Sequence, residues 1–234
     1  MSSTLYLIPA PLGENPHGAF LNSHYIEIIS GIQYIITENV RTARRYLKKT
    51  VPGIVIDDLE FSILDKKTPP EDIPVLLDPL LEGRDAGLIS EAGLPCIADP
   101  GNLLVAAAHK NRIRVHPIPG PSSIFLALEA SGFNGQQFSF HGYLPIDKKE
   151  LRSKIRELES VARSTGYTQI FMETPYRNNK LVEEVLSTCQ NKTLLSIAAE
   201  LTLSGEFVKT LSIDEWKKEK PDLHKRPAVF LLSV

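Results

Sequence analysis

The stretch that most constrains the fold of this 234-residue chain runs from Gly87 to Ala108, where strand, loop and helix signals follow one another. We expect Asp99 to cap the helix, because a carboxylate accepts the free N–H groups of the first turn, and Pro100 fits the first helical position. Open α/β sheets bind ligands at the carboxyl ends of such strands. Taken alone, the stretch also fits a plain strand-to-helix connection.

The same alternation of short apolar runs and amphipathic segments continues along the whole chain, which predicts an α/β fold. Further strands are expected over residues 5–8, 33–37, 53–57, 114–118, 137–143, 168–172, 194–199, 206–211 and 228–233. Helices are expected over residues 18–30, 38–49, 71–82, 124–132, 148–163 and from 178 to about 189, with a short one around Trp216. The sequence pattern changes beyond residue 132, so we place a domain boundary between about residues 118 and 135. We expect two domains, residues 1–118 and 119–234.

Composition excludes several classes of protein. The formal net charge is −2 and neither half is strongly basic, so a nucleic acid would have to be held by local patches. The two cysteines and six histidines lack metal-ligand spacing, so no metal is expected.

Neither G-x-G-x-x-G nor G-x-x-x-x-G-K-[ST] occurs, which argues against NAD and ATP. Without a leader or an apolar run of ~20 residues, we expect a cytoplasmic protein with no membrane contact.

Acidic side chains gather where predicted strands end. Glu38, Glu91, Asp99, Glu173 and Glu200 all lie at strand ends or in the loops just after them. Burying unpaired carboxylates is expensive, so packing alone gives no reason for this distribution, and a shared cleft would explain it.

A helix rich in arginine and lysine follows the second predicted strand. Residues 38–49 place basic side chains on one stripe and apolar ones on the other. This basic stripe is either a solvated face or a surface for phosphate contact.

Six motifs in order along the chain carry a resemblance to a known family. They are Pro9–Gly13, Glu38–Arg41, Ser90–Pro95 with Asp99–Gly101, Pro119–Ser122, Gly142–Pro145 and Glu173–Arg177. Together they resemble the ribosomal RNA small-subunit methyltransferase I family, in the tetrapyrrole methylase (class III) superfamily of S-adenosylmethionine-dependent methyltransferases. The resemblance implies two α/β domains of tetrapyrrole methylase type with the cofactor cleft between them, and a homodimer. Asn39-Val40 and Glu91 depart from the family's Asp-Thr and Asp.

The resemblance also implies which residues bind the cofactor, S-adenosyl-L-methionine. Each is carried over by its place in a matching motif: Glu91, Ala92, Gly93, Ser122, Ser123, Met172, Ala199, Pro227 and Ala228.

The chemistry of methyl transfer suggests the remaining roles. The donor methyl is already activated, so the protein mainly has to align the acceptor, and a ribose hydroxyl would also need a general base. Glu38, Asp99 and Glu200 are the candidates for base or substrate orientation. Arg41 and Arg177 are the candidates for phosphate contact, because a guanidinium binds phosphate bidentately.

Three functions remain open at this point. The first is 2′-O-methylation of ribose in small-subunit ribosomal RNA. The second is methylation of a small molecule such as a tetrapyrrole, which the near-neutral charge would suit. The third is a non-catalytic module that binds the cofactor or RNA, in which the altered segment around Asn39 no longer supports turnover.

Overall fold

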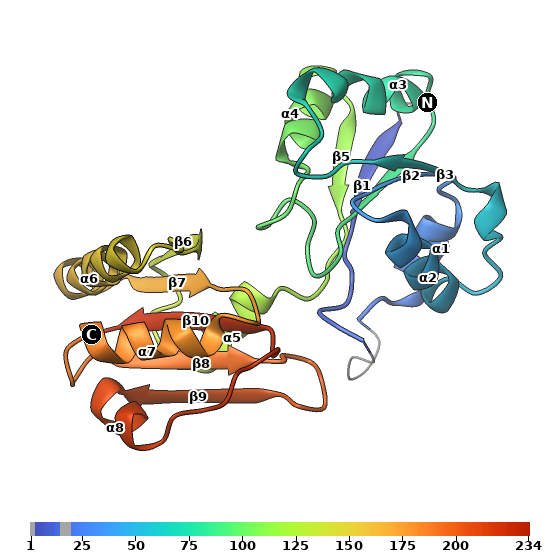
Figure 1. The fold of residues 1–234 in the computed structure, drawn as a ribbon. Helices are drawn as coiled ribbons and strands as arrows, with labels where there is room; N and C mark the ends of the chain where they lie inside the picture. The colour runs from blue at the N-terminus through green and yellow to red at the C-terminus, as the bar shows by residue number, and fades with distance from the viewer. Residues whose placement is uncertain (1–2, 15–19) are drawn as a thin grey trace. The chain divides into compact units, whose positions relative to one another are not determined.

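The computed structural model describes residues 3–14 and 20–234, which form two compact units. The first unit comprises residues 3–14 and 20–122, and the second comprises residues 123–234. Each unit contains one five-stranded sheet with helices packed on it, so the expected α/β class is confirmed (Figure 1).

The first unit is a parallel sheet whose strand order is β3-β2-β4-β1-β5. Its strands are β1 (Thr4–Ile8), β2 (Tyr34–Thr37), β3 (Glu60–Ile63), β4 (Ala86–Ile89) and β5 (Arg114–Pro117). Its helices are α1 (Ser23–Ser30), α2 (Val40–Thr50), α3 (Asp78–Leu81) and α4 (Asn102–Lys110), with short 3-10 helices at Ile56–Asp58, Pro70–Asp72 and Pro74–Leu77.

Alternating side chains of the parallel sheet supply two separate cores. Tyr34 and Ile36 of β2 pack with α3 and α4, whereas Ile35 packs with α1 and α2 on the opposite face (Figure 1). A sheet buried on both faces needs nearly continuous apolar strands, and this explains why β2 and β4 were predictable from sequence. All four residues of each of these strands are buried.

Three elements of the first unit differ from the sequence-based expectation. The helix expected to begin at residue 18 begins at Ser23, because the Asn22 side chain accepts a hydrogen bond from the Tyr25 N–H and caps it there; residues 18 and 19 lie outside the described residues. The third strand is Glu60–Ile63 rather than residues 53–57. The segment 71–82 is not one helix, because Pro74 and Pro79 divide it into short turns.

The second unit has a mixed sheet in the order β6-β7-β10-β8-β9. Its strands are β6 (Phe138–Tyr143), β7 (Thr168–Met172), β8 (Leu194–Ala199), β9 (Phe207–Ser212) and β10 (Ala228–Ser233). Its helices are α5 (Ser123–Ser131), α6 (Lys148–Thr165), α7 (Asn178–Thr188) and α8 (Ile213–Lys218). β10 runs antiparallel to both β7 and β8, so its first residues lie beside the carboxyl ends of those two strands.

Trp216 is the largest fully buried side chain of the second unit. It is 1% exposed, and its indole N–H donates a hydrogen bond to the Leu195 carbonyl, 2.8 Å away. We expect Trp216→Phe to lower the free energy of unfolding by about 1–3 kcal/mol, because the buried carbonyl loses its donor. Urea denaturation measures this, with Tyr143→Phe, at a side chain 53% exposed, as the control. Equal stability of the two variants would contradict the prediction.

No helix in the described part of the chain is both long and apolar enough to cross a membrane.

Candidate active site

Three loops at the carboxyl edge of the parallel sheet are joined to one another. Ala10, after β1, and Gly93, after β4, exchange two backbone hydrogen bonds of 2.8 and 3.0 Å. Gly93 has φ +72°, and a Cβ there would contact the Leu12 side chain at 3.3 Å and the Pro121 carbonyl at 3.5 Å. The loops after β1, β4 and β5 therefore form one surface.

The strand-to-helix junctions after β4 and β5 are not on neighbouring strands, because β1 lies between β4 and β5 in the sheet. The junctions still meet because the loop after β1 joins them. Gly120, after β5, lies so close to Pro9 that a Cβ on Gly120 would be 2.1 Å from the proline ring.

The loop that follows β4 ends differently from the expectation. Asp99 is not the N-cap of α4: the helix begins after Gly101, whose φ is +133°. The chain passes through positive φ values at Cys96 and Ala98 before this glycine, and these turns delay the start of the helix by two residues. The Asp99 carboxylate is consequently not used for capping.

Glu38, Glu91 and Asp99 interact electrostatically in this unit. Burial raises the pKa of Glu38, and the nearby charges of Asp99 and Glu91 raise it further. Burial also raises the pKa of Asp99, with Glu91 adding to the effect and Lys66 opposing it. Within the described residues, the buried Oε1 of Glu38 has no hydrogen-bond partner. An unpartnered buried carboxylate with a raised pKa is typical of a functional site.

Neighbouring elements hold Glu38 at the end of β2. Asn39 caps α2, its side-chain oxygen accepting hydrogen bonds from the N–H groups of Arg41 and Thr42 at 3.0 and 3.2 Å. The Tyr46 hydroxyl of the same helix donates a 2.6 Å hydrogen bond to the Pro9 carbonyl. α2 is thus tied to the loop after β1, and Glu38 is fixed between that helix and the strand.

The chain's own features in this unit fit the cofactor that the sequence implies. Glu91 and Ala92 are exposed and directly precede Gly93, whose backbone joins the loops after β1 and β4. Ser122 is buried, and Ser90 has a buried hydroxyl with no partner among the described residues. Carboxylates and free polar groups suit a ligand that carries a cation and hydroxyl groups.

Four of the remaining cofactor candidates lie at one edge of the second sheet. Ala199 pairs with Ala228, Met172 pairs with Val229, and the Glu200 N–H donates to the Pro227 carbonyl at 2.9 Å. Ser123 is the first residue of α5, a helix that packs against β8, β9 and β10.

The charged candidates of the second unit already have partners. Glu200 has φ +51° and accepts a 2.6 Å hydrogen bond from the Arg226 guanidinium. Glu173 accepts one of 2.5 Å from Arg177. In the first unit, Arg41 is exposed on α2 and makes no ion pair with the residues the structure describes. The sequence missed Arg226, because nothing in its pattern links it to Glu200, 26 residues earlier.

Lys66 was also missed. It lies in the loop after β3, where the sequence predicted neither a helix nor a strand, and its charge lowers the pKa of both Glu38 and Asp99. A lysine in a polar loop carries no sequence signal that distinguishes it from any other surface lysine.

Two other kinds of chemistry find no support in the described residues. Burial, with a smaller contribution from Asp99, raises the pKa of Cys96 to about 11, so this thiol is a poor nucleophile at neutral pH. Among residues 3–14 and 20–234, no group of three or more His, Cys, Asp or Glu side chains is arranged to hold a metal ion.

Comparison with known proteins identifies the class. A family model described as tetrapyrrole (corrin/porphyrin) methylases matches residues 25–216. The solved structure of the methyltransferase CobJ has a TM-score of 0.62 at 16% identity, covering 99% of this chain and 93% of that one. Cobalt precorrin-4 methyltransferase, a cobalamin biosynthetic enzyme, has a TM-score of 0.58 at 13% identity, covering 98% and 94%.

Curated relatives narrow the class further. A Halalkalibacterium halodurans protein named ribosomal RNA small subunit methyltransferase I is 33% identical over 219 residues, 92% of this chain and 71% of its own. The protein of that name from Vibrio cholerae is 29% identical over 231 residues, 97% of this chain and 76% of its own.

Fold, loops and family model together define a methyltransferase of the tetrapyrrole methylase class. Within that class, the chain belongs to the ribosomal RNA small subunit methyltransferase I family, and the resemblance drawn from its motifs is confirmed.

Proposed function

We propose that this chain transfers a methyl group from S-adenosyl-L-methionine to small-subunit ribosomal RNA, at a ribose 2′-hydroxyl. The observation that carries the choice of chemistry is Glu38, a half-buried carboxylate with an unpartnered oxygen and a raised pKa. A hydroxyl acceptor must lose its proton, and such a group accepts it well. The choice of substrate is supported by the names of the relatives, which are about 30% identical over nearly the whole chain.

In this proposal, the joined loops of the first unit bind the cofactor through Glu91, Ala92, Gly93 and Ser122. The bound cofactor supplies a methyl group on a sulphonium, which needs no further activation. The protein contributes alignment of the acceptor, which is worth roughly 7–11 kcal/mol in well-oriented reactions. Ser123, Met172, Ala199, Pro227 and Ala228 are proposed to complete the cofactor contacts.

The three acids that are candidates for the base then differ in role. Glu38 takes the proton, because its carboxylate is free, and Asp99 and Glu91 keep its affinity for a proton high. Glu200 is held by Arg226, so substrate orientation suits it better than proton transfer. Arg41 has no intramolecular ion pair among the described residues and is proposed to contact phosphate. Arg177 is proposed to do the same after exchanging its contact with Glu173.

The two other functions left open by the sequence are not favoured. The two solved structures compared above are only 16% and 13% identical to this chain, so their likeness reports the fold alone. A non-catalytic module would leave the unpartnered Glu38 without a purpose, since a buried free carboxylate costs stability.

A homodimer and a cytoplasmic location are part of the same proposal. The homodimer is implied by the family resemblance, and the cytoplasmic location is the expectation drawn from the sequence. Size-exclusion chromatography with light scattering tests the first, and cell fractionation tests the second.

The proposed function predicts a specific methylation product. Wild-type protein with isotopically labelled S-adenosylmethionine should label RNA in small ribosomal subunits from a strain of the source organism that lacks this gene. A 2′-O-methyl group blocks alkaline cleavage of the adjacent phosphodiester, so the label should appear in an alkali-resistant dinucleotide. We expect Glu91→Ala to reduce labelling at least tenfold and to weaken cofactor binding in calorimetry.

The matched control is Glu27→Ala, which removes an exposed acid on α1 and should label like wild type. Label in a single nucleotide after alkaline hydrolysis would place the methyl group on a base and refute the ribose assignment. Absence of label in RNA would refute the proposed function.

A further inference from the structure

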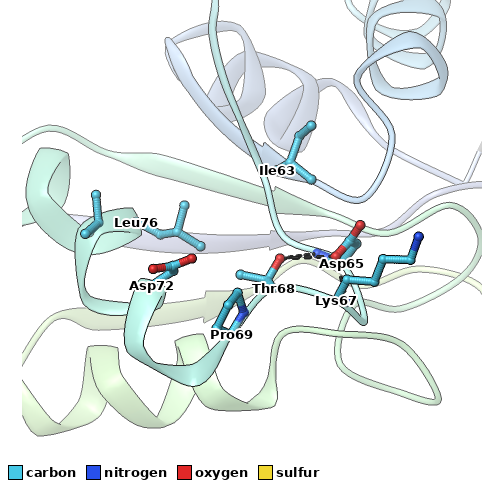
Figure 2. A pocket seen from close by; sticks show the side chains of 8 residues that line it. Ile63, Asp65, Lys67, Thr68, Pro69, Asp72 and Leu76 are labelled. Atoms are coloured by element: carbon cyan, nitrogen blue, oxygen red, sulfur yellow. Dashed lines mark hydrogen bonds between the residues drawn. The ribbon is translucent and has the colours of Figure 1, made fainter.

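A pocket of about 390 Å³ lies beyond the end of β3, and no role has yet been given to it (Figure 2). Its lining comes from the loop after β3 and from the 3-10 helices that follow. The residues that matter here are Ile63, Lys67, Thr68, Asp72 and Val75.

The pocket presents apolar walls to solvent. Ile63 is 56% exposed and Val75 is 64% exposed, although both are large aliphatic side chains. Pro69, which lies between Ile63 and Val75 in the sequence, is a third apolar residue of the lining. Exposed aliphatic side chains around a hollow are suited to a flat, partly apolar ligand.

Two charged groups in the pocket are available to a ligand. Among the described residues, neither the Asp72 carboxylate nor the Lys67 ammonium forms an ion pair or a hydrogen bond. Asp65, in contrast, accepts a 2.8 Å hydrogen bond from the Lys67 N–H and one of 3.2 Å from the Thr68 hydroxyl, which fixes the loop. Figure 2 shows Asp72 on one side of Thr68, and Lys67 with the Asp65 carboxylate beside it on the other side.

The pocket lies beside Glu38, the proposed general base. Ile63 pairs with Thr37 across the β2–β3 ladder, and the Leu64 N–H donates to the Thr37 carbonyl at 3.0 Å. Glu38 is the next residue after Thr37. Adjacent strands are about 4.8 Å apart, so a ligand in the pocket would lie within one nucleotide of a ribose at Glu38.

We propose that this pocket binds a nucleobase of the RNA substrate, on a nucleotide next to the one that is methylated. The base packs between Ile63 and Val75, its exocyclic amino group donates to Asp72, and Lys67 contacts the phosphate. Unstacked bases of single-stranded RNA are bound in this way, by apolar contact with their faces and hydrogen bonds to their edges. The inference rests on the proposed function and adds a determinant of substrate choice to it.

The test compares Asp72→Asn with Glu71→Gln, which changes the adjacent exposed acid outside the pocket. We expect Asp72→Asn to raise KM for small subunits about tenfold or more, as loss of a hydrogen bond to a charged group does, with cofactor affinity unchanged. Val75→Ser should raise the same KM, whereas Val55→Ser, at a side chain 57% exposed outside the pocket, should not. All four positions are on the surface, so folding is not at risk.

A second arm identifies the contact itself. In an RNA fragment around the mapped methyl group, each neighbouring base is replaced in turn by an analogue that lacks the exocyclic amino group. At one position, the analogue should reduce methylation by wild-type protein but cause no further loss in Asp72→Asn, which already lacks the contact.

The outcomes separate the two claims. If wild-type protein methylates RNA but Asp72→Asn and Val75→Ser match their controls, the pocket inference is overturned and the proposed function stands. If wild-type protein does not methylate RNA, both are overturned.

Discussion

Gly120→Ala should reduce methyl transfer at least a hundredfold and lower the free energy of unfolding by about 1–3 kcal/mol. The added Cβ would lie 2.1 Å from the Pro9 Cβ and 2.5 Å from its Cγ, far inside any allowed contact. Pro9 cannot retreat, because its carbonyl accepts the Tyr46 hydroxyl and the next residue is paired with Gly93. The loop after β5 must therefore move, and the proposed cofactor-binding loops move with it.

Gly31→Ala is the matched control for this experiment. Gly31 lies in the same unit, has an ordinary negative φ, and a Cβ there would make only a normal contact of 3.5 Å. Urea denaturation and methylation assays on both variants separate a local effect at the loops from a general effect of losing a glycine. Wild-type activity in Gly120→Ala would show that the loops after β1 and β5 need not stay in contact for function.

The sequence predicted β4 and most other strands well but misplaced β3. β4 is a run of buried apolar residues, whereas β3 at the sheet edge is only half-buried and mixes Glu60 and Ser62 with its apolar residues. β5, at the other edge of the sheet, has the same burial pattern and was predicted, so β3 was misplaced because its polar residues gave a weaker signal than the apolar run at 53–57. The apolar residues at 53–57 instead belong to the turn after α2 and to a short 3-10 helix.

The candidate site shows the same limit. Three of the acids expected at strand ends, Glu38, Glu91 and Asp99, do interact, because parallel strands deliver their carboxyl ends to one edge of the sheet. Contacts made across loops could not be anticipated: Asp99 is not a cap, and Arg226 takes the carboxylate of Glu200. Both depend on backbone turns at positive φ, in residues whose types do not demand that conformation.

The charge state of Glu38 should set the lower pH limit of activity. Its pKa is raised by burial and by Asp99 and Glu91, so the base is protonated at pH values where an ordinary glutamate is ionised. We expect kcat/KM to fall on the acid side at a pH above 4.5, the usual glutamate value. Glu38→Gln should lose about 10²–10⁴-fold in rate, whereas Glu27→Gln, on the surface of α1, should lose nothing.

Asp99→Asn provides the decisive comparison. Removing this neighbouring charge lowers the pKa of Glu38, so the acid limb should move to lower pH while activity remains. If Asp99 were the base, the pattern would reverse: Asp99→Asn would abolish the rate and Glu38→Gln would only shift the limb. Loss of activity in Glu200→Gln alone would reject both acids as the base.

The raised pKa of Glu38 should also make protein stability depend on pH. The folded state is favoured when Glu38 is protonated, whereas catalysis needs Glu38 ionised. A carboxyl group whose pKa is higher in the folded state binds its proton more tightly there, so stability falls as pH rises from the ordinary pKa through the raised one. At pH 7 the ionised Glu38 therefore opposes folding, and Glu38→Gln should raise Tm while it slows methyl transfer. Thermal unfolding at pH 4.5 and pH 7 measures this, and the gain should be larger at pH 7. A variant less stable than wild type at pH 7 would mean that Glu38 is a structural partner and not a base held in readiness for substrate.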